Sequence, residues 1–285
     1  MNLTPSPRPR RERGTLRARN LLLFASLLTL IGWAAPYAAG AQEPPRPTQR
    51  IVSSFDVSLV PGQYDVINQI LDFPPGAATR LHQHGGQAFV TVLEGQVTRR
   101  EGTVETVFGP GQTFIELPHT LHTVTNKGSV NARVFASFLL VPGARQTIDY
   151  PGVPAPAVSP KAAFVRRTTL NTQPGEFTLT QAIVDFAPGA FQPPHRHGGQ
   201  GLVMVIDGEV AFTNSAGEVR LKPGGIFADI GDPHDALNVA SGTSTTAVTF
   251  LIRKGERQTT LLTATAGAGP AIQPPATGDG GLLTR

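Results

Sequence analysis

The 285-residue chain contains no cysteine. This absence excludes a disulfide scaffold, a zinc site with cysteine ligands and a thiol nucleophile, and it fits either an oxidising or a reducing compartment. Charged residues make up only 15% of the chain and apolar residues 40%, which is typical of a globular protein and not of a disordered one. The 31 glycines and 26 prolines predict a chain with many turns.

The N-terminal 41 residues predict an export signal. Six arginines and a single acid, Glu12, lie among the first 20 residues, and the apolar run Leu21–Ala35 follows. Ala39-Gly40-Ala41 then supplies the small residues of a cleavage site. The apolar run is shorter than the roughly 20 residues that a membrane-spanning helix needs. We therefore expect residues 1–41 to be a signal peptide cleaved before Gln42, and the mature protein to be periplasmic or secreted, without a stable membrane anchor.

This segment also explains the basic character of the whole chain. The net charge is +4 with 24 basic and 20 acidic residues, but only 18 basic and 19 acidic residues remain after residue 41. A mature protein so close to neutrality has no basic patch with which to bind a nucleic acid. We therefore expect a small-molecule substrate and no nucleic-acid partner.

The rest of the chain is a duplicated unit. Pro61-Gly62-Gln63-Tyr64 recurs 113 positions later as Pro174-Gly175-Glu176-Phe177. His82-Gln83-His84-Gly85-Gly86-Gln87 recurs at the same offset as His195-Arg196-His197-Gly198-Gly199-Gln200. A register held over so many turn and histidine positions indicates a tandem duplication of a unit of domain size.

Each unit predicts short β-strands. Segments rich in β-branched and aromatic residues alternate with Pro-Gly, Gly-Gly and Glu/Asp-Gly turns, and apolar residues at helical spacing are missing. Many short strands at regular spacing favour an all-β chain of two jelly-roll barrels. The expected boundaries are a first barrel at 42–145, a proline-rich linker at 146–162, a second barrel at 163–262 and a disordered tail at 263–285.

Six of the seven histidines fall into two copies of one spacing: His82, His84 and His122 in the first unit, and His195, His197 and His234 in the second. Residues i and i+2 of a strand point to the same side, so the first two histidines of each unit can face a barrel interior. The third would arrive from a neighbouring strand. Three converging imidazoles predict one divalent transition metal per unit with an open coordination position. Fe, Mn, Cu, Ni and Zn all suit such ligands, and we favour Fe(II) or Mn(II).

These motifs resemble the two signature motifs of the cupins. The first unit has Gly76-x5-His82-x-His84 with Gly95, then Pro110 and His122-x3-Asn126. The second has Gly189-x5-His195-x-His197 with Gly208, then Pro223-Gly224 and His234-x3-Asn238. The resemblance covers about residues 50 to 260 and implies a bicupin, two double-stranded β-helix barrels with a metal pocket each. Cupins range from dioxygenases and oxalate decarboxylases to isomerases and storage proteins, so the fold alone does not name a reaction.

The chain departs from the cupin pattern at the glutamate ligand. The family places this glutamate seven residues before the hairpin glycine, where the chain has Ala88 and Gly201. Gln87 and Gln200 stand one residue earlier. Either a local bulge brings their amide oxygens to the metal, or both glutamines only form hydrogen bonds near the turn. Without a carboxylate, the three-histidine set resembles that of some iron-dependent cupin dioxygenases more than that of the glutamate-containing decarboxylases.

Two residues distinguish the first unit from the second. Arg80 lies two positions before His82, so it either faces the pocket, where it would bind an anionic substrate, or lies on the barrel rim. His119 stands where the second unit has Gly231, and it is either a proton donor near the metal or an exposed loop residue. Arg80 and His119 are therefore the candidate catalytic residues.

Glu116 and Asp229 are matched acids near the last histidine of each unit, and either could serve as an acid or base. Alternation with the apolar neighbours Ile115 and Leu117 predicts that Glu116 points away from the core.

Together, these patterns favour an exported bicupin metalloprotein that acts as a metal-dependent oxidoreductase, a quercetinase-like dioxygenase, on a small organic substrate. The alternatives are a non-catalytic cupin that binds metal or a small ligand, and an oxalate-decarboxylase-like lyase. A monomer, in which the two barrels form an intramolecular pseudo-dimer, and a homo-oligomer both remain open.

Overall fold

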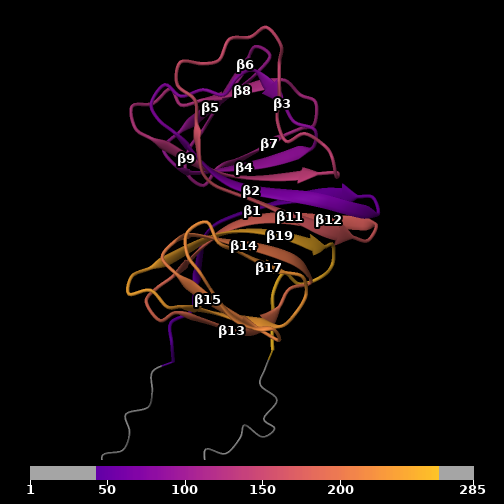
Figure 1. Ribbon diagram of the computed structural model, residues 1–285, viewed down its shortest axis with the longest axis vertical. Coiled ribbons are helices and arrows are strands. Elements are labelled where there is room, and N and C mark those ends of the chain that lie inside the picture. The colour runs from indigo at the N-terminus through magenta and orange to yellow at the C-terminus, as the bar shows by residue number, and fades with distance from the viewer. Residues whose placement is uncertain (1–42, 263–285) are drawn as a thin grey trace, which may run out of the picture. The chain divides into compact units, whose positions relative to one another are not determined.

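A computed structural model describes residues 43–262, so the expected signal peptide at 1–41 and the tail at 263–285 lie outside the described residues. Within this range every regular element is a β-strand and none is a helix, which confirms the all-β expectation (Figure 1). Among the described residues there is no helix of the length and apolarity that a membrane crossing requires.

The strands of the first repeat and the connection after it are β1 (Thr48–Leu59), β2 (Gly62–Phe73), β3 (His82–Gln83), β4 (Gln87–Glu94), β5 (Val97–Glu101), β6 (Val104–Phe108), β7 (Thr113–Glu116), β8 (His122–Thr125), β9 (Ala132–Leu140) and β10 (Ile148–Asp149). Those of the second repeat are β11 (Lys161–Thr172), β12 (Gly175–Phe186), β13 (Phe191–Arg196), β14 (Gly199–Asp207), β15 (Val210–Asn214), β16 (Gly217–Leu221), β17 (Ile226–Asp229), β18 (His234–Asn238), β19 (Ser244–Arg253) and β20 (Thr260–Leu261).

These strands form four antiparallel five-stranded sheets, two for each barrel. The first barrel consists of the sheets β11-β2-β9-β4-β7 and β10-β3-β8-β5-β6. The second consists of β1-β12-β19-β14-β17 and β16-β15-β18-β13-β20. Each barrel has its own apolar interior, with Phe73 and Phe138 in the first and Phe186 and Phe250 in the second.

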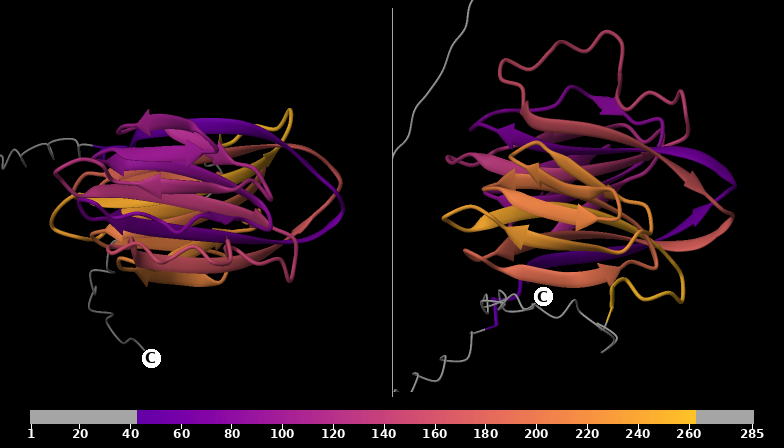
Figure 2. Two further views of the ribbon diagram at one scale, coloured as in Figure 1. Left: turned by 90° about the horizontal axis from the view of Figure 1, so that it is seen from above. Right: turned by 60° about the horizontal axis from the view of Figure 1, so that its bottom comes forward.

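The two barrels exchange their first strands. β1, from the first repeat, pairs with β12 of the second barrel, and β11, from the second repeat, pairs with β2 of the first. The connections β1–β2 and β11–β12 are only two residues long, yet each passes from one barrel to the other. Both connections lie at the same end of the described residues in the two views of Figure 2. The boundaries at 42–145 and 163–262 therefore follow the repeats along the chain but assign β1 and β11 to the wrong barrels.

The segment 146–162, expected as a linker, is built into the first barrel. Its strand β10 pairs with β3, and the backbone N–H of Ala78 donates to Val158 O at 3.0 Å. The N-terminal segment is used in the same way in the second barrel, where the N–H of Phe191 donates to Pro45 O at 2.8 Å. Each pocket mouth is thus edged by the segment that leads into an exchanged strand.

The sheets that contain the exchanged strands have two buried faces. On β4, Val90 points into the first barrel, while Phe89 packs into an apolar cluster between the barrels. This interbarrel cluster consists of Val57, Leu59, Tyr64, Val66, Phe89, Leu139, Leu170, Phe177, Leu179, Leu202 and Leu251. A strand buried on both faces is almost continuously apolar, which obscures the two-residue alternation.

A row of buried polar side chains crosses the same interface. Thr249 Oγ1 donates to Asn68 Oδ1 at 2.9 Å, and its oxygen lies 2.7 Å from Ser137 Oγ. Gln181 Nε2 donates to Ser137 Oγ at 2.7 Å. Buried polar groups are costly without partners, so this row stabilises one register between the barrels.

Candidate metal centres

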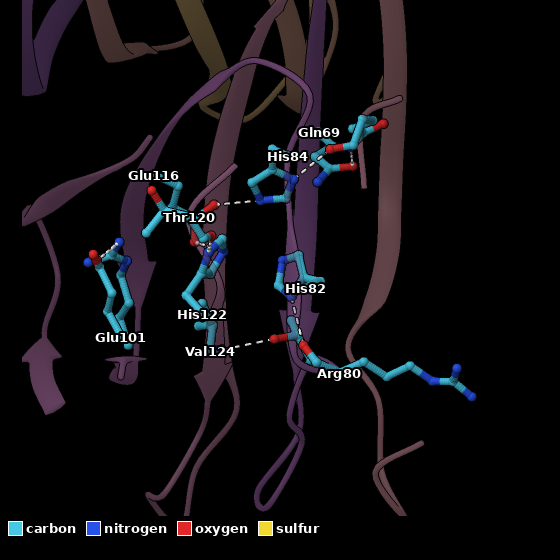
Figure 3. A network of polar contacts seen from close by, with 12 residues as sticks. Gln69, Arg80, His82, His84, Glu101, Glu116, Thr120, His122 and Val124 are labelled. Atoms are coloured by element: carbon cyan, nitrogen blue, oxygen red, sulfur yellow. Dashed lines mark hydrogen bonds and ion pairs between the residues drawn. The ribbon is translucent and has the colours of Figure 1, made fainter. Parts of the chain in front are cut away.

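The first barrel brings His82, His84 and His122 together (Figure 3), and His82 and His84 line its pocket. His82 on β3 lies directly opposite His122 on β8, and their ring centroids are 4.3 Å apart. His84 follows β3 on the same side, with its ring 4.8 Å from that of His82. One potential ligand atom from each residue lies within 4.8 Å of the other two, and all three side chains are buried.

Backbone carbonyl groups determine which ring nitrogen of each histidine is free. His82 Nδ1 donates to Arg80 O at 2.7 Å, His84 Nδ1 to Gln146 O at 2.5 Å and His122 Nδ1 to Thr120 O at 2.9 Å. A carbonyl oxygen only accepts, so Nδ1 bears the hydrogen and Nε2 of the neutral ring keeps a lone pair. Burial, with repulsion from the neighbouring imidazoles, lowers the pKa of His82 to about 4. This neutral, oriented form of the imidazole is the one that binds metals.

Glu116 completes this cluster, and the prediction that it points away from the core is wrong. Its side chain is 4% exposed, with Oε2 at 2.9 Å from His84 Nε2 and Oε1 at 2.8 Å from His122 Nε2 (Figure 3). Burial alone would raise the pKa of Glu116, but hydrogen bonds from the two imidazoles, which require a proton on each Nε2, outweigh burial and hold this pKa well below its usual range. The apolar neighbour Ile115 packs against the interbarrel cluster instead, so the two faces of β7 are the reverse of those expected.

The second barrel repeats the histidine arrangement. His195 on β13 pairs with His234 on β18, their centroids 4.2 Å apart, and His197 lies 4.9 Å from His195. His195 Nδ1 donates to Pro193 O at 2.8 Å and His197 Nδ1 to Gln258 O at 2.5 Å. Burial is also the largest cause that lowers the pKa of both His195 and His197 to about 4.

Asp229 takes the place of Glu116 but has one methylene fewer. Its Oδ2 is 3.9 Å from His197 Nε2 and its Oδ1 is 3.8 Å from His234 Nδ1, beyond hydrogen-bonding distance. The backbone N–H of Gly231 donates to Oδ1 at 2.9 Å, whereas the buried Oδ2 has no hydrogen-bond partner. Burial raises the pKa of Asp229.

Both clusters fit a bound cation. In the first barrel, acceptor lone pairs on two imidazoles face an acceptor carboxylate at about hydrogen-bonding distance, an arrangement that is repulsive unless a proton or a metal ion lies between them. In the second, the unpaired oxygen of Asp229 faces His197 across a gap. Two histidine-based sites able to hold a divalent metal are therefore present, one in each barrel.

Gln87 and Gln200 do not join the histidines. Gln87 is two positions from Phe89 on β4, on the strand face that packs between the barrels, and Gln200 has the same relation to Leu202 on β14. Gln200 Nε2 donates to Asn171 O at 3.4 Å, on the exchanged strand β11. The hypothesis that a bulge brings both amides to a metal is therefore not supported.

Arg80 and His119 also lie outside the cluster. Arg80 is exposed at the pocket mouth, its side chain runs away from the histidines in Figure 3, and its guanidinium is 3.5 Å from Asp149. His119 is exposed and has a positive φ of 59°, and only its backbone N–H reaches the site, donating to His84 O at 2.9 Å. The positive φ explains the glycine at the equivalent Gly231, since glycine adopts this conformation at the lowest cost.

One structural element of the sites was missed. The carbonyl groups of Gln146 and Gln258 accept from His84 and His197, and those of Arg145 and Arg257 accept from the N–H groups of Gly85 and Gly198. The signal was in the repeat, because Arg145-Gln146-Thr147 recurs as Arg257-Gln258-Thr259. The segment that follows β9 in the first barrel, and β19 in the second, thus holds the ring of His84 or His197 through a backbone carbonyl.

The pockets above the two clusters differ. The first has a volume of about 340 Å³, apolar walls that include Phe73, Val134 and Phe138, and a polar mouth with Arg80 and Asp149. The second has a volume of about 230 Å³. Its mouth carries no charged side chain among the described residues and is edged by Pro47, Gln49, Gln192 and Thr259.

Comparisons with known proteins agree with this architecture. The family model for the cupin domain matches residues 69–138 and again residues 182–250. The chain belongs to the cupin superfamily. No curated protein sequence matches it significantly. The two domains make it a bicupin, and the resemblance seen in the histidine motifs is confirmed.

Two solved structures illustrate the range of proteins with a similar fold. A variant of oxalate decarboxylase from Bacillus subtilis is similar with a TM-score of 0.51 at 12% identity, over 77% of this chain and 78% of that chain. The vicilin from Solanum melongena gives a TM-score of 0.53 at 12% identity, over 68% of this chain and 76% of the other. At such low identity these similarities establish the fold and not the activity.

Proposed function

We propose that this bicupin is an exported, metal-dependent oxidoreductase that acts on a small organic molecule in its first barrel, specifically as a quercetinase-like dioxygenase. The observation that carries the proposal is the convergence of His82, His84 and His122, two of which, His82 and His84, line a pocket of about 340 Å³. Such a volume lies within the usual range of ligand pockets, about 300–1,000 Å³. Export to the periplasm or beyond is supported by the N-terminal pattern of residues 1–41.

In this proposal His82, His84 and His122 hold the metal, with Fe(II) or Mn(II) as the favoured ions. The bound ion supplies Lewis-acid activation of substrate or oxygen at a coordination position that the protein leaves open. The apolar walls exclude water from the reacting groups. Gln146 Nε2 donates to Gln69 Oε1 at 3.1 Å, and this amide pair lines the pocket where it can orient a polar group of the substrate.

The first barrel is the better catalytic candidate for two reasons. Its pocket is larger by about half, and its mouth carries Arg80 and Asp149, charged side chains that can move to admit an anionic group. We propose that the second barrel, with its smaller and uncharged pocket, binds metal mainly to stabilise the fold.

An oxalate-decarboxylase-like lyase is the second candidate. Glu116 favours it, because the carboxylate that the sequence pattern lacked is present beside two of the histidines. The apolar walls formed by Phe73, Val134 and Phe138 favour the oxidoreductase instead, since a small dianion would gain nothing from them. A non-catalytic cupin that binds metal or a small ligand is the third.

The test begins with the metal content of the purified protein, followed by oxygen uptake with flavonols, diketones and phenolics. We expect uptake that requires metal, that is lost in His122→Ala and that is kept in His234→Ala, the matched change in the second barrel. Metal content is measured for each variant. A fully loaded protein that consumes no oxygen with any of these substrates refutes the dioxygenase.

Chelation separates the remaining candidates. If chelation removes activity with little change in melting temperature, the metal is catalytic. A large fall in melting temperature in a protein that shows neither oxygen uptake nor carbon dioxide release from oxalate supports the non-catalytic alternative. Release of carbon dioxide from oxalate supports the lyase.

A further inference from the structure

The two acids Glu116 and Asp229 occupy equivalent places relative to the missing glutamate. Ala88 on β4 pairs directly with Glu116 on β7, and Gly201 on β14 pairs directly with Asp229 on β17. Directly paired residues of antiparallel strands place their side chains on the same face of the sheet. Each acid therefore projects into the same barrel interior as the position at which the cupin pattern has its glutamate.

We infer that the metal-binding carboxylate of this protein has moved to the neighbouring strand, so that Glu116 and Asp229 are the fourth protein ligands of the two metal centres. This inference rests on the proposed metal sites and names residues that the histidine motifs do not include. It gives each centre three neutral imidazoles and one carboxylate.

The geometry of the first barrel supports direct ligation. Two ligands bound side by side to one ion at about 2.1 Å, at right angles, are separated by about 3.0 Å. The distances from the Glu116 oxygens to His84 Nε2 and His122 Nε2 are 2.9 and 2.8 Å. Glu116 is 3% exposed, and its carboxylate faces lone pairs of the neutral imidazoles that repel it, so a cation shared with the imidazoles removes an unfavourable contact.

The second barrel supports it independently. Asp229 is 2% exposed, Gly231 N–H holds its Oδ1, and the remaining Oδ2 is unpaired and lies 3.9 Å from His197 Nε2. A buried carboxylate oxygen without a partner is costly and indicates a ligand. Position 201 leaves little room for an acid, because a Cβ there would lie 3.2 Å from the Phe250 ring.

The ligand carboxylate comes from a different strand than in the cupin pattern, and this changes what the site can do. Glu116 contacts two of the three imidazoles, so it reduces the charge of the centre by one unit from the side of β7. The side of β4, with the small residue Ala88, is left apolar.

The test measures Mn(II) binding to the purified, metal-free full-length protein in the absence of substrate. Glu116→Gln keeps the size of the side chain and removes its charge, and Glu105→Gln, at an exposed glutamate paired with Lys127, is the matched control. We expect Glu116→Gln to weaken Mn(II) binding at one site by more than the roughly 10–100-fold that loss of an outer-sphere partner costs. The control should bind as the unaltered protein does, and Asp229→Asn should weaken binding at the other site.

Direct ligation is then read from structure and spectra. In a crystal structure with Mn(II), located by its anomalous scattering, a carboxylate oxygen of Glu116 should lie about 2.0–2.3 Å from the ion, and the Mn(II) EPR spectrum should change in Glu116→Gln. The exchange Glu116→Ala with Ala88→Glu keeps the total volume and returns the carboxylate to β4. We expect it to recover part of the affinity that Glu116→Ala alone loses.

Three results would overturn the inference: Mn(II) bound by Glu116→Gln as tightly as by the control, a water molecule between Glu116 and the ion, or no loss of affinity in Asp229→Asn. Melting curves of the metal-free variants show whether any loss reflects misfolding. The readouts involve no substrate, so a protein that binds Mn(II) through Glu116 but consumes no oxygen rejects the dioxygenase and leaves the ligand assignment standing.

Discussion

The exchange of β1 and β11 predicts that damage to the first strand of the first repeat weakens the second barrel. Val57 and Leu59 on β1 are 5% and 7% exposed and pair with Phe177 and Gly175 on β12. Burial of one such aliphatic side chain contributes about 1.5–3 kcal/mol, so truncation of both to alanine should cost about 3–6 kcal/mol. This is a large part of the roughly 5–15 kcal/mol by which a protein is usually stable.

Hydrogen exchange resolved by peptide is the assay that locates this loss. β1 is an edge strand whose backbone pairs with β12 alone, so amides of β12 and the adjacent β19 should exchange faster in the Val57→Ala, Leu59→Ala protein. Amides of β2 and β9 should keep more of their protection. Val52→Ala is the control, since this residue of the same strand is 51% exposed and its truncation should change stability by less than about 0.5 kcal/mol.

The opposite pattern would refute the exchange. If β2 lost protection first while β12 stayed protected, β1 would belong to the barrel of its own repeat. A urea titration gives the total loss of free energy for comparison, and a loss within about 0.5 kcal/mol would contradict the burial of Val57 and Leu59 in the interbarrel cluster.

Two further predictions concern the metal-free protein. Burial lowers the pKa of His82, His195 and His197 from 6.5 to about 4, so between these pH values the unfolded chain binds more protons than the folded one. The free energy of unfolding should be greatest above pH 6.5 and fall as the pH decreases toward 4. An unchanged urea midpoint over that range would contradict this. Gly86→Ala would place a Cβ 2.3 Å from Leu139 O, and we expect a cost of about 1–3 kcal/mol and weaker metal binding. Gly242→Ala, with open space around it, should melt as the parent does, and equal melting of both variants would refute the contact.

The duplication and the histidine spacing made the fold and the core of the sites predictable. The two-residue period of a strand is local, so His82 and His84 share a face whatever the rest of the chain does. His122 and its counterpart His234 could be matched because the repeat preserved their distance from the first motif. The all-β architecture and the family followed from the same motifs.

The direction of Glu116 was predicted wrongly because the alternation of residues along a strand separates its two faces but does not say which face lies toward the barrel interior. An apolar Ile115 was expected to face the barrel interior, but the sheet also has a buried face against the other barrel, and Ile115 packs there. The same ambiguity applied to Gln87, which lies on the same face of β4 as Phe89, toward the other barrel. A strand buried on both faces has no polar, solvent-exposed face, so its sequence does not show which alternate residues point into the barrel.

By itself, the sequence determined that this protein is a duplicated chain of β-strands with two sets of histidines, because strand period, turn residues and repeat register are properties of neighbouring residues. Only the tertiary structure decided that β1 and β11 change barrels and that Glu116 and Asp229 join the histidines. A connection as short as Val60-Pro61 fits a hairpin or a crossing equally well. The choice depends on the apolar cluster and the polar row between the barrels, which exist only when both repeats are folded together.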